Sequence, residues 1–168
     1  MKKYIAVAIC SLAVVLWVGF IWSNSAKTGE ESGEMSSQVQ EVIVEVSEKL
    51  DMDVPTTERT VRKSAHFLEY MVLGLLLGAD MALICALLSR KTLLSDILRI
   101  LIALPVSFSV ALIDEFVIQK ATEGRGPSFI DVLIDTSGNI LGILIIILAL
   151  LLTRHILRKR AERVSKAV

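Results

Sequence analysis

The sequence predicts an all-α polytopic membrane protein, an antiparallel bundle of four transmembrane helices in a single domain over residues 1–168. Hydrophobic residues make up 54% of the chain, the formal net charge is zero and the mean hydropathy is +0.64. A soluble domain of this size needs a more polar surface. Four apolar stretches are each long enough to cross a hydrocarbon layer of about 30 Å. We place the spans at about 4–22, 61–88, 93–118 and 129–152.

The first apolar stretch follows Lys2 and Lys3, and a basic start before an apolar run is also typical of a secretory signal peptide. This run is longer than a typical signal, and no A-x-A cleavage site follows it. We therefore expect an uncleaved helix, with Trp17 and Trp22 in an interfacial belt.

Residues 23–60 form a polar loop between the first two spans. Within this loop, apolar residues recur every three or four positions at Val39, Val42, Ile43, Val46 and Leu50. That period predicts a short amphipathic helix, which lies on the outer membrane surface or caps the bundle. Pro55 and Thr56 then open the second span.

Only short linkers join the remaining spans. Residues 89–92 make a tight basic turn, and residues 119–127 make a glycine-rich loop that Ser128 and Asp131 close as a capping pair. Pro105 is expected to kink the third span. The G-x-x-x-G spacings 74–78 and 138–142 favour close helix packing inside the bundle, and homodimerisation is the alternative.

Lys and Arg counts in the loops predict the orientation, because basic loops normally stay in the cytoplasm. The more basic side carries Lys2, Lys3, Arg90, Lys91, Arg154, Arg158, Lys159, Arg160, Arg163 and Lys166. We expect both termini to be cytoplasmic in a bacterial inner membrane, with a basic tail over residues 153–168 on anionic lipid headgroups. No aromatic pattern accompanies these charges, so nucleic acid is not an expected partner.

Polar residues interrupt the spans mainly at the predicted outer end. A charged group inside a bilayer is costly, so such residues usually face the bundle interior and mark a site or a structural pair. The candidate ligand-binding residues are Arg62, Lys63, His66, Glu69, Asp114, Glu115, Gln119, Arg125, Ser128, Asp131, Asp135 and Asn139. Deeper in the bundle, Asp80 and Arg99 are expected to form a structural pair.

The spacing within these sets is helical. Arg62, His66 and Glu69 repeat at i, i+4 and i+7, and Asp131, Asp135 and Asn139 repeat at i, i+4 and i+8. Each set therefore lines one helix face. In an antiparallel bundle three helix ends meet at this level, which predicts a cavity with cationic, acidic and imidazole groups side by side.

Three blocks in this order resemble the VanZ-like family. They are Arg62-Lys63-Ser64-Ala65-His66-Phe67-Leu68-Glu69-Tyr70 with Leu73-Gly74, then Asp114-Glu115-Phe116 to Gln119, and then Gly124-Arg125, Ser128, Asp131-Val132, Gly138 and Gly142. The family usually has Asn where this chain has Asp135. The resemblance implies a cell-envelope membrane protein associated with teicoplanin resistance, and it implies no established reaction.

Three classes of function fit these residues. The first is recognition of an anionic ligand at the outer leaflet, such as a lipid-linked phosphate or a cell-wall precursor, through the arginines. The second is an intramembrane hydrolase or transferase that holds a metal. The chain has no HExxH motif, cysteine cluster or nucleophile elbow, and this disfavours an enzyme. The third is a structural accessory subunit whose charges only set helix register.

The sequence predicts no specific cofactor, although His66 and the carboxylates are compatible with a divalent cation. The expected partners are membrane lipids and a lipid-linked phosphate or cell-wall precursor. A homo-oligomer is compatible with the glycine spacings.

Overall fold

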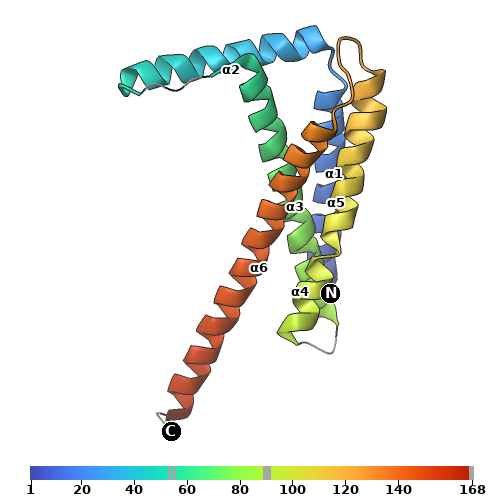
Figure 1. The fold of residues 1–168 in the computed structure, drawn as a ribbon. Coiled ribbons are helices and arrows are strands. Elements are labelled where there is room, and N and C mark those ends of the chain that lie inside the picture. The colour runs from blue at the N-terminus through green and yellow to red at the C-terminus, as the bar shows by residue number, and fades with distance from the viewer. Residues whose placement is uncertain (53, 55, 89–91, 167–168) are drawn as a thin grey trace.

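The computed structural model describes residues 1–52, 54, 56–88 and 92–166, and within these ranges it contains helices and no strand. The elements are α1 (Lys2–Ser25), α2 (Gly29–Lys49), α3 (Glu58–Leu87), α4 (Leu93–Ile100), α5 (Ala103–Ile113), the π-helix η1 (Asp114–Gln119) and α6 (Phe129–Lys166) (Figure 1). Four helical segments of the described chain are long and apolar enough to span a membrane: Lys2–Ser25, Glu58–Leu87, Leu93–Gln119 and Phe129–Ser165. The predicted four-span helical architecture is confirmed. Pro55 and the basic turn residues 89–91 lie outside the described residues.

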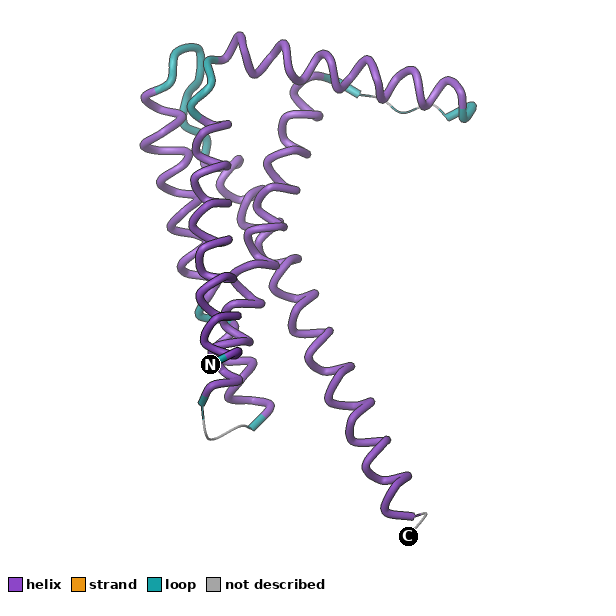
Figure 2. Tube along the Cα trace, turned by 180° about the vertical axis from the view of Figure 1, so that it is seen from behind, coloured by secondary structure: helices purple, strands orange, loops and turns teal. Residues whose placement is uncertain are grey.

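The long helices run roughly alongside one another, and α2 lies across one end of them (Figure 1). Both chain termini are at the opposite end, as four consecutive crossings require. The C-terminal half of α6 extends away from the other helices in both views (Figures 1 and 2). The core contains Tyr70, Leu73, Ile100, Val132 and Ile143, each at most 1% exposed.

Helix α2 begins at a capping box. The Oγ1 atom of Thr28 accepts a hydrogen bond from the backbone N–H of Glu31 at 3.2 Å, and the N–H of Thr28 donates to Glu31 Oε2 at 2.8 Å. The backbone N–H and the hydroxyl of Thr28 both donate to the Glu31 carboxylate, and these two hydrogen bonds lower the pKa of Glu31. The reciprocal bonds explain why the helix starts directly after the short turn that follows α1.

At 21 residues, α2 is longer than the short helix that the apolar spacing predicts. Its buried residues are Ser32, Ser36 and Ser47, whereas the apolar side chains of Val42 and Leu50 are 59% and 63% exposed. The described chain therefore leaves most of the apolar stripe uncovered. Its placement on the membrane surface stays a prediction.

The third span is interrupted between α4 and α5. Leu101 and Ile102 form a turn, and Pro105 follows in the first turn of α5. Proline lacks the N–H that would bond to the carbonyl four residues earlier, and its ring clashes with that carbonyl. For Pro105 that residue is Leu101, so the proline accounts for the position of the break.

Helices α3 and α6 make the closest contact in the bundle. A Cβ atom added at Gly74 would collide with the backbone of Asn139, and one added at Gly138 or Gly142 would collide with the carbonyl oxygen of Phe67 or Met71. Glycine is the residue that lets two helix backbones approach this far. Gly78 also faces α6, where an added Cβ would lie 3.2 Å from the side chain of Ile146, so all four predicted glycines pack inside one chain.

One expectation about the other end of the bundle was wrong. Asp80 does not pair with Arg99 but accepts a hydrogen bond from Ser11 Oγ of α1 at 3.0 Å. Asp96 is the carboxylate that pairs with Arg154, and it also lies 3.7 Å from Arg99. Because Asp80 faces α1, it cannot meet α4. Helix α6 does not end with the predicted span at residue 152 but continues through the basic tail to Lys166, because this segment is rich in good helix formers.

Substitution of Gly142 by alanine tests the glycine contact. We expect Gly142→Ala to lower the free energy of unfolding by about 1–3 kcal/mol, because the new methyl group overpacks the α3–α6 interface. Reversible unfolding of the purified protein in detergent measures this loss. Gly19→Ala is the control, since nothing lies within 4 Å of a Cβ atom there. Equal stability of the two variants would contradict the close contact.

Candidate functional site

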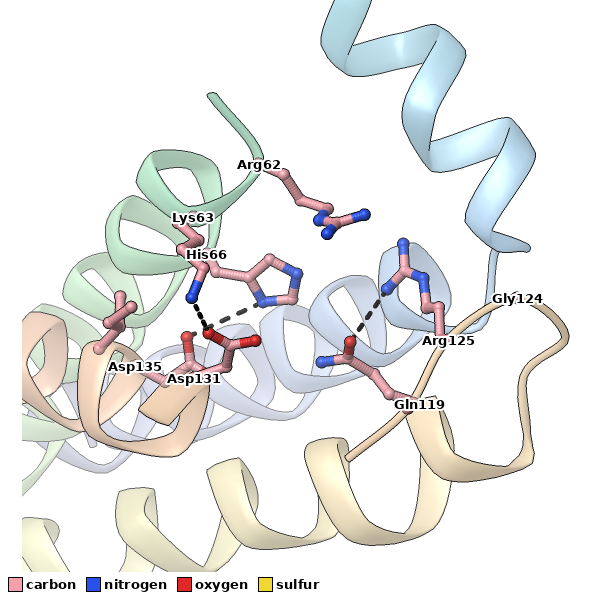
Figure 3. Close-up of a pocket in the computed structure, with 10 residues that line it drawn as sticks. Arg62, Lys63, His66, Gln119, Gly124, Arg125, Asp131 and Asp135 are labelled. Atoms are coloured by element: carbon pink, nitrogen blue, oxygen red, sulfur yellow. Dashed lines mark hydrogen bonds and ion pairs between the residues drawn. The ribbon is translucent and has the colours of Figure 1, made fainter. Parts of the chain in front are cut away.

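Polar side chains from three elements and one loop meet at the end of the bundle that carries α2. They surround a cavity of about 130 Å³ (Figure 3). We call this cavity the polar pocket, and it is lined by Arg62, Lys63, His66, Gln119, Gly124, Arg125, Gly126, Asp131, Ile134 and Asp135. Helix α3 supplies the first three of these residues and α6 the last three.

Two cross-helix pairs form the α3–α6 wall of the pocket. Lys63 forms an ion pair with Asp131, and both side chains are partly buried. One turn deeper, His66 Nδ1 lies 3.8 Å from Asp135 Oδ1, and the Asp135 side chain is fully buried. The i, i+3 spacing of Lys63 and His66 on α3 matches the i, i+4 spacing of Asp131 and Asp135 on α6, so the two pairs stay in register.

The π-helix η1 forms the opposite wall. Asp114, Glu115 and Gln119 are all buried. A π-helical turn closes hydrogen bonds from i to i+5 and is frequent at functional sites. The wider turn brings Glu115 and Gln119 together, with Gln119 Nε2 donating to Glu115 Oε2 at 2.6 Å.

Glu115 also holds the loop of residues 120–128 in place. Its Oε1 atom accepts a hydrogen bond from the backbone N–H of Ser128 at 2.7 Å. The hydroxyl of Ser128 in turn accepts from the backbone N–H of Asp131 at 3.3 Å, which caps the start of α6. One buried carboxylate therefore links η1, the loop and α6.

Glycines dock the same loop against the start of α2. The N–H of Gly29 donates to the carbonyl oxygen of Glu123 at 2.9 Å. A Cβ atom at Gly29 would lie 2.5 Å from Gly124 O, and Gly124 itself has a φ of +72°. Glycine adopts this left-handed conformation without a steric penalty. The turn directs Arg125 into the polar pocket, where its Nη1 atom donates to Gln119 Oε1 at 3.4 Å.

The side chains of Arg62 and Arg125 extend toward one another beside the His66 ring (Figure 3). Partial burial, together with the neighbouring charge of Arg62, lowers the pKa of Arg125. Within the described part of the chain neither arginine forms an ion pair with a carboxylate. Two guanidinium groups placed this way favour an anion between them.

The floor of the site is acidic. Asp114, Asp135 and Asn139 are each 0% exposed. Asp114 Oδ2 accepts a hydrogen bond from Ser25 Oγ of α1 at 2.9 Å. The other oxygen of Asp114 and all side-chain polar atoms of Asp135 and Asn139 have no hydrogen-bond partner among the described residues. His66, Asp114 and Asp135 are the described groups placed to share a metal ion.

A second, mostly apolar cavity of about 330 Å³ adjoins the polar pocket between α2 and α3. We call it the apolar groove. Its apolar lining comes from Met35, Val39, Ile43, Val61, Ala65 and Leu68. Arg62, His66 and Arg125 line both cavities, so the groove and the pocket meet at these basic side chains.

Seven of the twelve predicted site residues line the polar pocket: Arg62, Lys63, His66, Gln119, Arg125, Asp131 and Asp135. Asp114, Glu115, Ser128 and Asn139 support it from behind. Glu69 does not join it, because its carboxylate lies in the apolar groove and accepts a hydrogen bond from Asn24 Nδ2 at 2.8 Å.

Sequence reasoning missed Asn24 and Ser25, which bind Glu69 and Asp114. Their position directly after the first apolar run was the available signal. It also missed Gly126 and Ile134 in the pocket lining. No sequence pattern marks η1, since a π-helical turn has no clear residue signature.

The fold and the site define a class: a four-span helical membrane protein with a basic pocket over buried carboxylates at one end. The family model VanZ/LLP1 matches residues 10–152. The chain therefore belongs to the VanZ/LLP1 family, which confirms the resemblance found in the sequence. No curated protein and no solved structure matches it significantly.

Replacement of Glu115 tests how the loop is held. We expect Glu115→Ala to speed amide hydrogen exchange in residues 120–128, because the N–H of Ser128 loses its acceptor. Exchange measured by mass spectrometry in detergent reports this loss. Glu123→Ala removes an exposed carboxylate from the same loop and should leave exchange unchanged. Equal protection in the two variants would contradict the role of Glu115.

Proposed function

We propose that the protein recognises the phosphate or pyrophosphate group of a lipid-linked cell-envelope ligand at the outer leaflet, and that it affects teicoplanin susceptibility through this ligand. The observation that carries the proposal is the pair Arg62 and Arg125, which face one another across the polar pocket with no carboxylate partner among the described residues. Arginine forms bidentate, charge-assisted hydrogen bonds with phosphate oxygens.

The apolar groove supports a lipid-linked ligand over a soluble one. An amphiphile with a phosphate headgroup needs a charged site next to an apolar channel. Here the apolar groove meets the polar pocket at Arg62, His66 and Arg125. A phosphate held by the arginines would leave its hydrocarbon chain beside Val39, Ile43 and Leu68.

The distribution of charge supports an outer-leaflet position for the pocket. Arg158, Lys159, Arg160 and Arg163 extend from the far end of α6, at the end of the molecule opposite α2. Basic segments next to a span stay in the cytoplasm. The pocket then faces the outer leaflet of a bacterial cytoplasmic membrane, and the exposed apolar side chains of α2 rest on that leaflet.

Binding of a polyprenyl phosphate tests the proposal directly. We expect Arg62→Ala and Arg125→Ala each to weaken binding by about 10- to 100-fold, as the loss of a charge-assisted hydrogen bond of ~1.5–3 kcal/mol predicts. Native mass spectrometry of detergent-solubilised protein measures the bound fraction. Lys120→Ala, which removes an exposed cation outside the pocket, should bind like the parent.

Two further compounds, tested in the same binding experiment, identify the source of the phosphate. Inorganic phosphate should compete only weakly, because it gains nothing from the apolar groove. A neutral polyprenol should not bind measurably. Equal binding by the parent protein and both arginine variants would contradict the proposal.

The link to the envelope is tested in cells. We expect expression in a susceptible Gram-positive host to raise the teicoplanin concentration needed for growth inhibition. Arg125→Ala and His66→Ala, at matched membrane levels, should lose this protection because both residues line the polar pocket. Absence of protection by the parent protein would remove the resistance role, and protection by both variants would separate resistance from the pocket.

A further inference from the structure

Three side chains from three separate elements converge beneath the polar pocket. His66 of α3, Asp114 of η1 and Asp135 of α6 each present one ligand atom, and these atoms all lie within 4.8 Å of one another. Residues so far apart in sequence meet only because the α3–α6 contact and the π-helical turn bring them to one level. The imidazole and carboxylates are common ligands of divalent metals.

Burial makes this cluster different from a surface group of acids. Asp114 and Asp135 are each 0% exposed, and His66 is mostly buried. In the described part of the chain, one oxygen of Asp114, both oxygens of Asp135 and Nδ1 of His66 lack hydrogen-bond partners. Native proteins satisfy nearly all buried polar atoms, so several orphans at one point indicate a missing partner.

The basic residues nearby do not supply that partner. Lys63 is engaged by Asp131, and Arg125 donates to Gln119. The one ionic contact of Asp135 in the described chain is His66 Nδ1 at 3.8 Å. A buried carboxylate without a cation is strongly unfavourable. We propose that His66, Asp114 and Asp135 together bind a divalent transition-metal cation.

The ligand types favour Zn²⁺ or Mn²⁺ over Mg²⁺ and Ca²⁺. An imidazole nitrogen suits the transition metals, whereas Mg²⁺ and Ca²⁺ take oxygen ligands. Metal–ligand bonds of about 2.0–2.2 Å require the ligand atoms to draw slightly closer than they lie here. Asn139 is one turn from Asp135 on the same face of α6, fully buried, and both its side-chain polar atoms lack partners in the described chain. Its side-chain oxygen is therefore a further unpartnered oxygen atom one helical turn from the cluster.

The cation would lie at the floor of the polar pocket, since His66 and Asp135 line it. It would add positive charge beneath Arg62 and Arg125 and give a phosphate a third point of attachment. The metal site does not rest on the proposed ligand, because the buried carboxylate oxygens of Asp114 and Asp135 lack partners in the described chain whatever binds above them. The metal site is therefore tested by a separate experiment.

The test is metal binding by the full-length protein, purified in detergent through an affinity tag that contains no histidine. After EDTA treatment and its removal, the protein is equilibrated with Zn²⁺ or Mn²⁺ and passed over a sizing column. Elemental mass spectrometry then gives the metal content. We expect a single equivalent in the parent protein. Affinity should fall by at least ~10- to 100-fold in Asp135→Asn and His66→Gln, which each remove a direct ligand.

Asp80→Asn is the matched control. It removes another buried carboxylate from α3, about 21 Å along the helix from His66 at 1.5 Å per residue. This variant should bind metal like the parent. Thermal unfolding gives a second readout. A cooperative unfolding transition in each variant also shows that the variant is folded. The metal should raise the melting temperature of the parent and of Asp80→Asn but not that of the ligand variants.

Two results would overturn the site. One is a parent protein that binds no metal and shows no rise in melting temperature. The other is equal metal binding by the parent, Asp135→Asn and His66→Gln. If Asp135 carries a proton instead of binding a metal, Asp135→Asn in EDTA should melt at or above the melting temperature of the parent. Added metal should then change the melting temperature of neither protein.

Discussion

The close contact of α3 and α6 is the constraint on which the rest of the molecule depends. Gly74, Gly138 and Gly142 remove the Cβ atoms that would keep the two backbones apart. Lipid surrounds such helices with a medium as apolar as their side chains, so close packing has to hold them together. The contact also sets the register in which His66 meets Asp135 and Lys63 meets Asp131.

A second constraint comes from the π-helical end of the third span. The wider turn places Asp114 and Glu115 inside the bundle, where the two carboxylates have different roles. Glu115 is satisfied by Gln119 and Ser128, and it fixes the loop that carries Arg125. Asp114 receives one hydrogen bond from Ser25 and keeps a free oxygen among the described residues. One acid is therefore structural, and its neighbour remains available for a ligand.

The charges of the site are layered by depth. The arginines lie at the mouth of the polar pocket, the Lys63–Asp131 pair forms its wall, and the fully buried carboxylates form its floor. Unpaired groups of opposite sign at two depths suit a ligand that carries an anion above and a cation below. A phosphate group with a bound metal ion has this arrangement of charge.

The sequence by itself determined the membrane architecture, because apolar runs of about 20 residues have few alternatives to spanning helices. It also determined most of the pocket lining, since helical periodicity places Arg62 with His66 and Asp131 with Asp135 on single faces. The side chains that pair across the bundle were harder to predict. The pairing of Asp80 with Arg99 is predicted because both are ionisable residues within apolar spans, yet it is Ser11 of α1 that donates a hydrogen bond to Asp80.

Only the tertiary structure decided which groups share a cavity. The direction in which Glu69 points depends on α1, whose Asn24 binds it, and no local pattern records that neighbour. The π-helical turn likewise depends on buried partners for Glu115 and on the packing of α5 and α6 rather than on residue type. Contacts between distant segments, including the meeting of His66, Asp114 and Asp135, arise from packing geometry, which sequence periodicity does not encode.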